Sequence, residues 1–163
     1  MDALTEAQIR ASLINVTQSE RKNITLATDP SGLTWDQMDF FGSRDRKLPL
    51  VGYVVAIVDD APVGLLLRRA EAKPRSRTQC SWCNDIRLPN DVLLWAAKRT
   101  GDAGRRGDTV GTFACDGFQC NANARARPPL AYVGFDVEAA RLSRIEAMRD
   151  SVASFVRVVR DGL

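Results

Sequence analysis

The stretch from residue 80 to residue 120 decides the fold. It opens with Cys80-Ser81-Trp82-Cys83 and closes with Cys115-Asp116-Gly117-Phe118-Gln119-Cys120, and it holds all four cysteines of a 163-residue chain that has no histidine. Two close cysteine pairs separated by about thirty residues are typical of a four-thiolate zinc site. Zinc suits four thiolates because it is borderline-soft and readily accepts a tetrahedron of sulfurs. The sequence therefore predicts a Zn²⁺ ion held by Cys80, Cys83, Cys115 and Cys120.

Two other roles compete with metal binding. Cysteines are often small buried core residues, but here none lies outside the two pairs. Disulfides belong mainly to secreted proteins, and the N-terminus Met1–Glu6 lacks the basic and apolar regions of a signal peptide. The longest apolar run, Val54–Val58, is too short to span a bilayer. We therefore expect a cytoplasmic protein with reduced thiols.

Positive charge gathers around the cysteines. From Lys73 to Arg127 ten basic residues face five acidic ones, a net of +5, so the rest of the chain carries −2 of the overall +3. This asymmetry favours an acidic partner. Trp82 or Phe118 could stack on a base. The arginines that could neutralise phosphates are Arg68, Arg69, Arg75, Arg77, Arg105, Arg106, Arg125 and Arg127. A nucleic-acid partner, such as ribosomal RNA, is therefore an alternative to a protein partner.

The hydrophobic pattern predicts an α+β fold in two parts. Residues 1–47 are interpreted as an N-terminal helical segment, in which Thr5 and Gln8 form a capping box for a helix reaching about Glu20. Further along, Trp35, Met38 and Phe41 are expected to pack this segment onto the core. Residues 48–163 are interpreted as an antiparallel β/α domain. The expected elements are a hairpin of 51–58 and 62–67, strands at 91–98 and 109–114, and helices at about 116–127 and 136–160, with charged loops at 42–49 and 99–108.

The order of these elements around the cysteines is that of a treble clef. A knuckle carries the first pair, a hairpin follows, and the last ligand lies at a helix start. Cys120 would fall in the first helical turn, where free backbone amides favour a thiolate. The C-terminal helix carries an apolar stripe from Val137 to Val159, which is expected to pack on the sheet.

Three features together resemble a known family. They are the knuckle Cys80–Cys83, the hairpin end Gly111-Thr112-Phe113-Ala114-Cys115, and the Cys115–Cys120 turn followed by Asn121. With the C-terminal amphipathic helix, they resemble the treble-clef domain of the fusidic-acid resistance (FusB-type) proteins, which bind elongation factor G. The resemblance spans about Leu50 to Leu163. It implies one structural zinc ion, docking of the finger on elongation factor G, and release of that factor from a ribosome stalled by fusidic acid.

The resemblance also implies which residues contact the partner. They would be Gln79, Arg106, Thr109 and Leu130, with Arg105 beside Arg106 at the hairpin tip. The family has aromatic residues at the positions of Gln79 and Thr109, so this chain departs from it at two sites where an aromatic side chain could anchor a partner.

The sequence also argues against catalysis. Four cysteines would fill the coordination shell of a zinc ion, whereas a catalytic zinc keeps a position open. The chain has no histidine and no phosphate-binding P-loop, which excludes His-based catalysis and that class of nucleotide hydrolysis. The carboxylate pair Asp59-Asp60 is interpreted as a hairpin turn. We therefore expect a binding protein rather than an enzyme.

Overall fold

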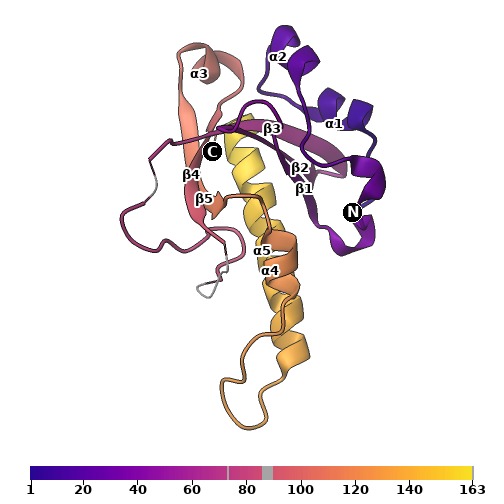
Figure 1. The fold of residues 1–163 in the computed structure, drawn as a ribbon, viewed down its shortest axis with the longest axis vertical. Helices are drawn as coiled ribbons and strands as arrows, with labels where there is room; N and C mark the ends of the chain where they lie inside the picture. Colours follow the sequence, from indigo (N-terminus) through magenta and orange to yellow (C-terminus); the bar gives the residue numbers. More distant parts are fainter. Residues whose placement is uncertain (73, 86–89, 163) are drawn as a thin grey trace.

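The computed structural model describes residues 1–72, 74–85 and 90–162 (Figure 1). Within these ranges, five strands form one antiparallel sheet in the order β1-β2-β3-β4-β5. The strands are β1 Phe40–Arg44, β2 Val51–Val58, β3 Ala61–Arg69, β4 Val92–Lys98 and β5 Thr109–Cys115. The helices are α1 Glu6–Ser12, α2 Gln18–Asn23, α3 Gly101–Arg105, α4 Cys120–Arg125 and α5 Val137–Asp161, with 3₁₀ turns at Pro30–Gly32 and Trp35–Gln37. The structure confirms the predicted α+β fold.

Strand β2 is the centre of the molecule because both of its faces are covered. All of its residues except Ile57 are buried. Val54 belongs to the same apolar cluster as Met148 and Val152 of α5, whereas its neighbour Val55 packs with Ile9 of α1. Successive side chains of a strand point to opposite faces. The sheet is therefore the middle of three layers, with the N-terminal segment on one face and α5 on the other.

The predicted hairpin of β2 and β3 is confirmed. The two strands pair from Val51–Arg68 to Val58–Ala61, and the turn residues Asp59 and Asp60 have φ values of 52° and 61°. Two consecutive residues with positive φ make the tight turn whose twist suits a hairpin. Asp59 also accepts ion pairs from Arg157 and Arg160 of α5, at 3.3 and 2.7 Å, so the turn is tied to the C-terminal helix.

The N-terminal segment departs from the prediction of one helix reaching Glu20. The capping box at Thr5 is present, but α1 ends at Ser12. Leu13 then forms a parallel bridge with Gly64 of β3, and the amide of Ile14 donates to the Gly64 carbonyl at 3.0 Å. The edge of the sheet captures the backbone here, so the helix cannot continue. A second capping box, at Thr17, starts α2.

The predicted charged loop at 42–49 is wrong for its first residues, because 42–44 belong to strand β1. Phe40 to Arg44 pair with Ala56 to Gly52 of β2, because the short strand completes the sheet beside a long apolar neighbour. Trp35 and Met38 pack against the cluster that contains Phe41, as expected, with the Trp35 and Phe41 rings 5.9 Å apart. The boundary drawn at residues 47 and 48 lies between two paired strands, so the two parts share one sheet.

Helix α5 confirms the longest predicted helix. The Asp136 carboxylate caps it by accepting from the Ala139 amide at 2.9 Å, and Gly162 ends it in the left-handed conformation. The helix is buried against the sheet from Met148 onward, while its first turns extend beyond the sheet beside α4 (Figure 1). In the described ranges, no helix combines the length and apolarity that crossing a membrane requires.

Candidate metal centre

The four cysteine sulfurs meet in one buried cluster. All four residues are buried, and their Sγ atoms lie within 4.8 Å of one another. The Sγ atoms of Cys80 and Cys120 are 3.6 Å apart, and those of Cys83 and Cys115 are 3.8 Å apart. These distances are far too long for disulfide bonds. A zinc ion with Zn–S bonds of about 2.3 Å places its tetrahedral sulfurs about 3.8 Å apart, so the cluster has the dimensions of a four-thiolate zinc site.

Local turns place the first pair of ligands. The amide of Ser81 donates to the Phe113 carbonyl at 2.8 Å, which fastens the knuckle to the edge of β5. The amide of Asn84 then donates back to the Cys80 carbonyl at 3.0 Å, and Asn84 adopts a φ of 51°. Asparagine tolerates this left-handed conformation better than most residues. The knuckle is thus closed by its own backbone.

The second pair joins a strand to a helix. Cys115 is the last residue of β5 and Cys120 is the first residue of α4. Between them, the Phe118 amide donates to the Cys115 carbonyl at 2.9 Å. The prediction that Cys120 lies in the first turn of a helix is confirmed, and with it the treble-clef order of knuckle, hairpin and helix.

The thiols influence one another's ionisation. The hydrogen bond with Cys115 lowers the pKa of Cys80, whereas the hydrogen bond with the same residue raises the pKa of Cys120. The opposite directions mean that the cluster ionises in part and then resists further loss of protons, because neighbouring thiolates repel one another. A divalent cation removes that repulsion, so the donor set suits a metal that binds thiolates.

Two donors outside the ligand set point at the sulfurs. The Trp82 backbone amide donates to Cys80 Sγ at 3.4 Å. The side chain of Asn123, which is buried in α4, donates to Cys115 Sγ at 3.4 Å and to Asn90 Oδ1 at 3.1 Å. Hydrogen bonds to a ligand from outside the coordination shell hold its orientation. Asn123 is therefore a positioning residue of the metal centre.

An arginine ties this centre to the C-terminal helix. Arg144 of α5 donates to Asp85 Oδ2 at 2.7 Å and to the Asn123 carbonyl at 3.0 Å. Asp85 lies two residues beyond Cys83, so one guanidinium links both halves of the metal centre to α5. Sequence reasoning missed Asn123 and Arg144, since neither position has a local signature.

Trp82 and Phe118 do not lie on the surface, contrary to the prediction that they contact a partner. They are only 2% and 4% exposed. The Trp82 ring packs edge-on against Phe40. Phe118 packs on two glycines: a Cβ added to Gly42 would lie 2.5 Å from the Phe118 Cβ, and one added to Gly52 would lie 2.7 Å from the Phe118 ring. Both rings belong to the core between the metal centre and the sheet. They cannot stack on a base.

The other predicted contact residues are exposed but do not gather in one place. Arg105 and Thr109 lie at the tip of the β4–β5 hairpin, together with Arg106. Leu130 lies in the connection between α4 and α5, at the opposite end of the molecule (Figure 1). Gln79, next to the knuckle, is exposed and donates to the Asn84 carbonyl at 2.9 Å.

The hairpin tip contains structure where a loop was predicted. It folds into α3, and Thr100 joins it to the end of α5: its amide donates to the Val159 carbonyl at 3.2 Å and its hydroxyl to the Arg160 carbonyl at 2.6 Å. Arg105 pairs with Asp102. The tip is therefore anchored to α5 although its arginines face solvent.

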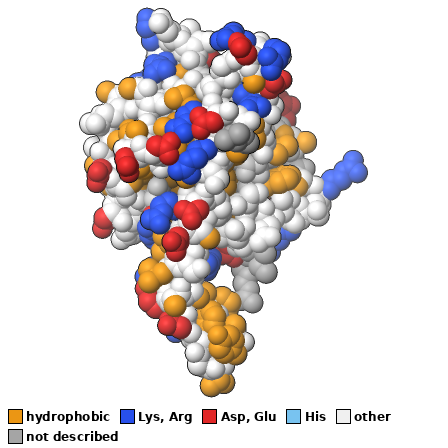
Figure 2. All heavy atoms as spheres, turned by 180° about the vertical axis from the view of Figure 1, so that it is seen from behind, with side chains coloured by type: hydrophobic (Ala, Val, Ile, Leu, Met, Phe, Trp, Pro, Cys, Tyr) orange, Lys and Arg blue, Asp and Glu red, His pale blue; other side chains and the backbone are white. Residues whose placement is uncertain are grey.

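The α4–α5 connection exposes an apolar surface. Only Leu130 of it was named from the sequence, through the family resemblance. Leu130 and Tyr132 are 69% and 67% exposed, and Val133 is fully exposed. Leu142, on the first turns of α5, is also exposed. Figure 2 shows hydrophobic side chains gathered on the narrow end of the molecule that this connection forms. We call this surface, Leu130–Val133 with Leu142, the apolar tip.

One protein family matches most of the chain. The family model of the FBP C-terminal treble-clef zinc-finger matches residues 8–159. The match begins well before Leu50, so the N-terminal segment and β1 belong to the matched region as well. No curated protein and no solved structure gave a significant match. With four buried cysteines at zinc-site dimensions, the chain belongs to the FusB-type treble-clef zinc-finger family and binds one structural Zn²⁺ ion through Cys80, Cys83, Cys115 and Cys120.

Proposed function

We propose that the protein binds elongation factor G through its zinc-finger domain and promotes release of that factor from the ribosome. Membership of the FusB-type family supports a translation factor as the partner. The observation that carries the proposal is the apolar tip, because three large side chains stand exposed on a narrow projection. Contiguous exposed apolar surface of this kind marks protein interaction sites.

The metal centre supports a binding role over a catalytic one. Four cysteines complete a tetrahedral zinc shell, and a closed shell leaves no position for water or substrate. The zinc holds α4 against the knuckle, and Arg144 joins α4 to the first turns of α5. The apolar tip therefore projects from a metal-stabilised base, and such a base would reduce the ordering cost of binding.

Two independent reasons favour Leu130 as a contact residue. It is one of the contacts that the family resemblance implies, and it belongs to the apolar tip. Tyr132, two residues further on, packs edge-on against Phe135, with ring centroids 5.3 Å apart. An aromatic side chain that could anchor a partner therefore lies close to Leu130. The chain lacks the family's aromatic rings at Gln79 and Thr109. Tyrosine is among the residues that most often dominate binding energy.

The test is binding of zinc-loaded protein to elongation factor G from the same organism, measured by calorimetry. We expect Leu130→Ser with Tyr132→Ser to weaken the complex at least about tenfold, as for central interface residues. Leu48→Ser is the matched control because Leu48 is an exposed leucine far from the apolar tip in sequence and in the fold. Arg105→Glu with Arg106→Glu asks whether the opposite end also contributes. Absence of a complex at micromolar protein in low salt would refute the proposed partner.

The alternative of a finger that binds ribosomal RNA keeps the basic side chains but loses its stacking platforms, since Trp82 and Phe118 are buried. A salt series separates the two functions. Binding to RNA falls steeply with salt because counterions are released from phosphates, whereas a complex formed through the apolar tip should weaken much less.

A further inference from the structure

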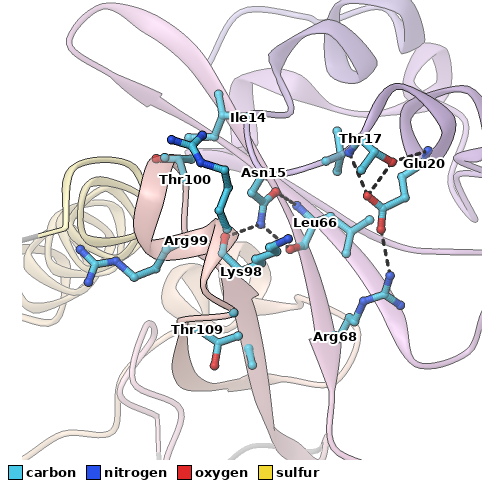
Figure 3. Close-up of a pocket in the computed structure, with 16 residues that line it drawn as sticks. Ile14, Asn15, Thr17, Glu20, Leu66, Arg68, Lys98, Arg99, Thr100 and Thr109 are labelled. Atoms are coloured by element: carbon cyan, nitrogen blue, oxygen red, sulfur yellow. Dashed lines mark hydrogen bonds and ion pairs between the residues drawn. The ribbon is translucent and has the colours of Figure 1, made fainter.

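A second surface lies at the other end of the molecule from the apolar tip. It is a cleft of about 750 Å³ between the residues that join α1 to α2 and the tip of the β4–β5 hairpin (Figure 3). Its floor contains Leu66 of β3 and Lys98 of β4. We call it the Lys98 cleft. Its size is within the range of small-molecule sites, about 300–1,000 Å³.

The cleft exists because the sheet divides at this point. β3 and β4 pair only from Leu67 to Arg69, and the earlier edge of β3 is occupied by Leu13, which bridges Gly64. Asn15 holds the division open: its side chain accepts from the Leu66 amide at 2.8 Å and donates to the carbonyls of Leu66 and Lys98 at 2.9 and 3.1 Å. The opening is thus fixed by hydrogen bonds and does not depend on a ligand.

The lining is strongly positive. Four cations, Arg68, Lys98, Arg99 and Arg105, face one carboxylate, Glu20, which gives a net charge of +3. Such a concave positive surface attracts anions.

Most of these cations already have a place in the structure. Arg68 pairs with Glu20 at 3.1 Å. Figure 3 shows Arg99 extending away from the cleft toward α5, where its guanidinium lies against Gly162. The Lys98 side chain is exposed and, within the ranges that the structure describes, pairs with no carboxylate. Arg105 pairs with Asp102. Among the described lining residues, Lys98 is therefore the cation with neither an ion pair nor a packed position.

Neutral donors and an apolar wall accompany Lys98. Thr109 is its direct cross-strand partner on β5, so both side chains rise from the same face of the sheet. Gly101 and Gly107 have open space where a Cβ would stand, which leaves nearby backbone accessible to a ligand. Ile14 and Val16 form an apolar wall of the same cleft. The surface thus offers a cation and a hydroxyl beside a patch suited to a flat apolar group.

We propose that the Lys98 cleft binds a nucleotide unit, with its phosphate on Lys98 and Thr109 and its base against Ile14 and Val16. Lysine binds phosphate as a point charge, and small-molecule pockets are lined mainly by apolar side chains beside a few polar groups. The unit is either a free nucleotide or part of a single-stranded RNA. This inference is separate from the proposed function, because the cleft and the apolar tip lie at opposite ends of the molecule.

The test uses isotope-labelled, zinc-loaded full-length protein in low salt and amide NMR. The probes are adenosine 5′-monophosphate, adenosine, and a short single-stranded oligoadenylate. We expect the monophosphate to shift the amides of Asn15, Gly101 and Thr109 in a saturable way, with adenosine binding far more weakly because it lacks the phosphate. Lys98→Glu should weaken binding at least about tenfold, and Thr109→Val about fivefold, as for a charged and a neutral hydrogen bond.

Matched controls distinguish the outcomes. Lys47→Glu makes the same charge change at an exposed lysine outside the cleft and should leave binding unchanged. Binding of the oligoadenylate but not of the monophosphate would identify RNA as the source of the phosphate, and binding of both would identify a free nucleotide as sufficient. Shifts that appear elsewhere, equal binding by adenosine, or affinity unaffected by Lys98→Glu would overturn the proposal. The apolar-tip variant Leu130→Ser should bind the monophosphate normally whether or not elongation factor G is the partner.

Discussion

The zinc-binding half and the N-terminal layer lie on opposite faces of one sheet, yet they are held by different forces. The zinc half gathers four thiols and a continuous aromatic core around Trp82. The N-terminal layer has smaller apolar clusters and depends on charged groups that bind the backbone. The centre of that layer is Asp45, which accepts hydrogen bonds from Thr25, Lys47, Leu48 and Tyr53. One half should therefore be lost all at once when its ion is removed, and the other should weaken gradually with pH.

The largest effect expected is on the zinc half. Removing zinc with a chelator, or the change Cys83→Ser, should unfold this half, because structural zinc contributes on the order of 10 kcal/mol of binding energy that is coupled to folding. Metal analysis measures the zinc content, and the dispersion of the NMR signals reports whether this half is folded. Protein purified in reductant that contains no zinc and is fully folded would contradict it.

A smaller effect is expected for the N-terminal layer. Burial raises the pKa of Asp45, but hydrogen bonds from Tyr53 and Thr25 outweigh it and lower the pKa to about 2. A carboxylate whose pKa is depressed on folding adds stability that is full above its unfolded pKa and is lost as the pH falls toward the folded pKa. Asp45→Asn should therefore cost about 2 kcal/mol at neutral pH.

Urea unfolding at neutral pH and near pH 3 measures that contribution. The difference in stability between the native protein and the Asp45→Asn variant should shrink on acidification, because protonation removes the same charge that the variant lacks. Asp150→Asn, at an exposed position of α5, is the control and should change little. A constant difference across this pH window would show that Asp45 acts through packing alone.

At the link between zinc and α4, the expected effect is on metal affinity rather than on the stability of a whole layer. Asn123→Ala removes the side-chain donor to Cys115 Sγ, and loss of such a partner lowers metal affinity by about 10- to 100-fold. Competition with a chromophoric chelator measures the affinity. Asn121→Ala is the matched control, because the Asn121 side chain also lies on α4 but donates to the Phe40 carbonyl and accepts from the Asp39 amide instead of bonding to a sulfur. Equal losses in the two variants would assign Asn123 a purely structural role.

The zinc ligands were predictable because cysteine spacing is a property of the chain alone. The long C-terminal helix and the β2–β3 hairpin were predictable as well, since strong apolar periodicity and the Asp59-Asp60 turn are local signals. The break at Leu13 was not, because it depends on Gly64 of β3, which offers a free edge only in the folded sheet.

Surface residues were harder to predict than ligands. The positions of Trp82 and Phe118 beside cysteines do not reveal which way their rings point, and Gly42 and Gly52 make room for Phe118 from strands remote in sequence. The Lys98 cleft joins three distant segments, so no local pattern marks it. The apolar run from Leu130 to Val133 was visible in the sequence, but its exposure depends on how far α5 extends beyond the sheet.

Helix α5 connects the apolar tip to the Lys98 cleft and sets the distance between them. Its 25 residues correspond to a length of about 37 Å. The apolar tip lies at its N-terminal end, and Thr100 of the cleft wall is bound to its last turn. A partner that engages both surfaces must present matching contacts at that spacing. When it does, the first contact raises the effective concentration of the second, so two weak attachments would add up to a strong and distance-selective one.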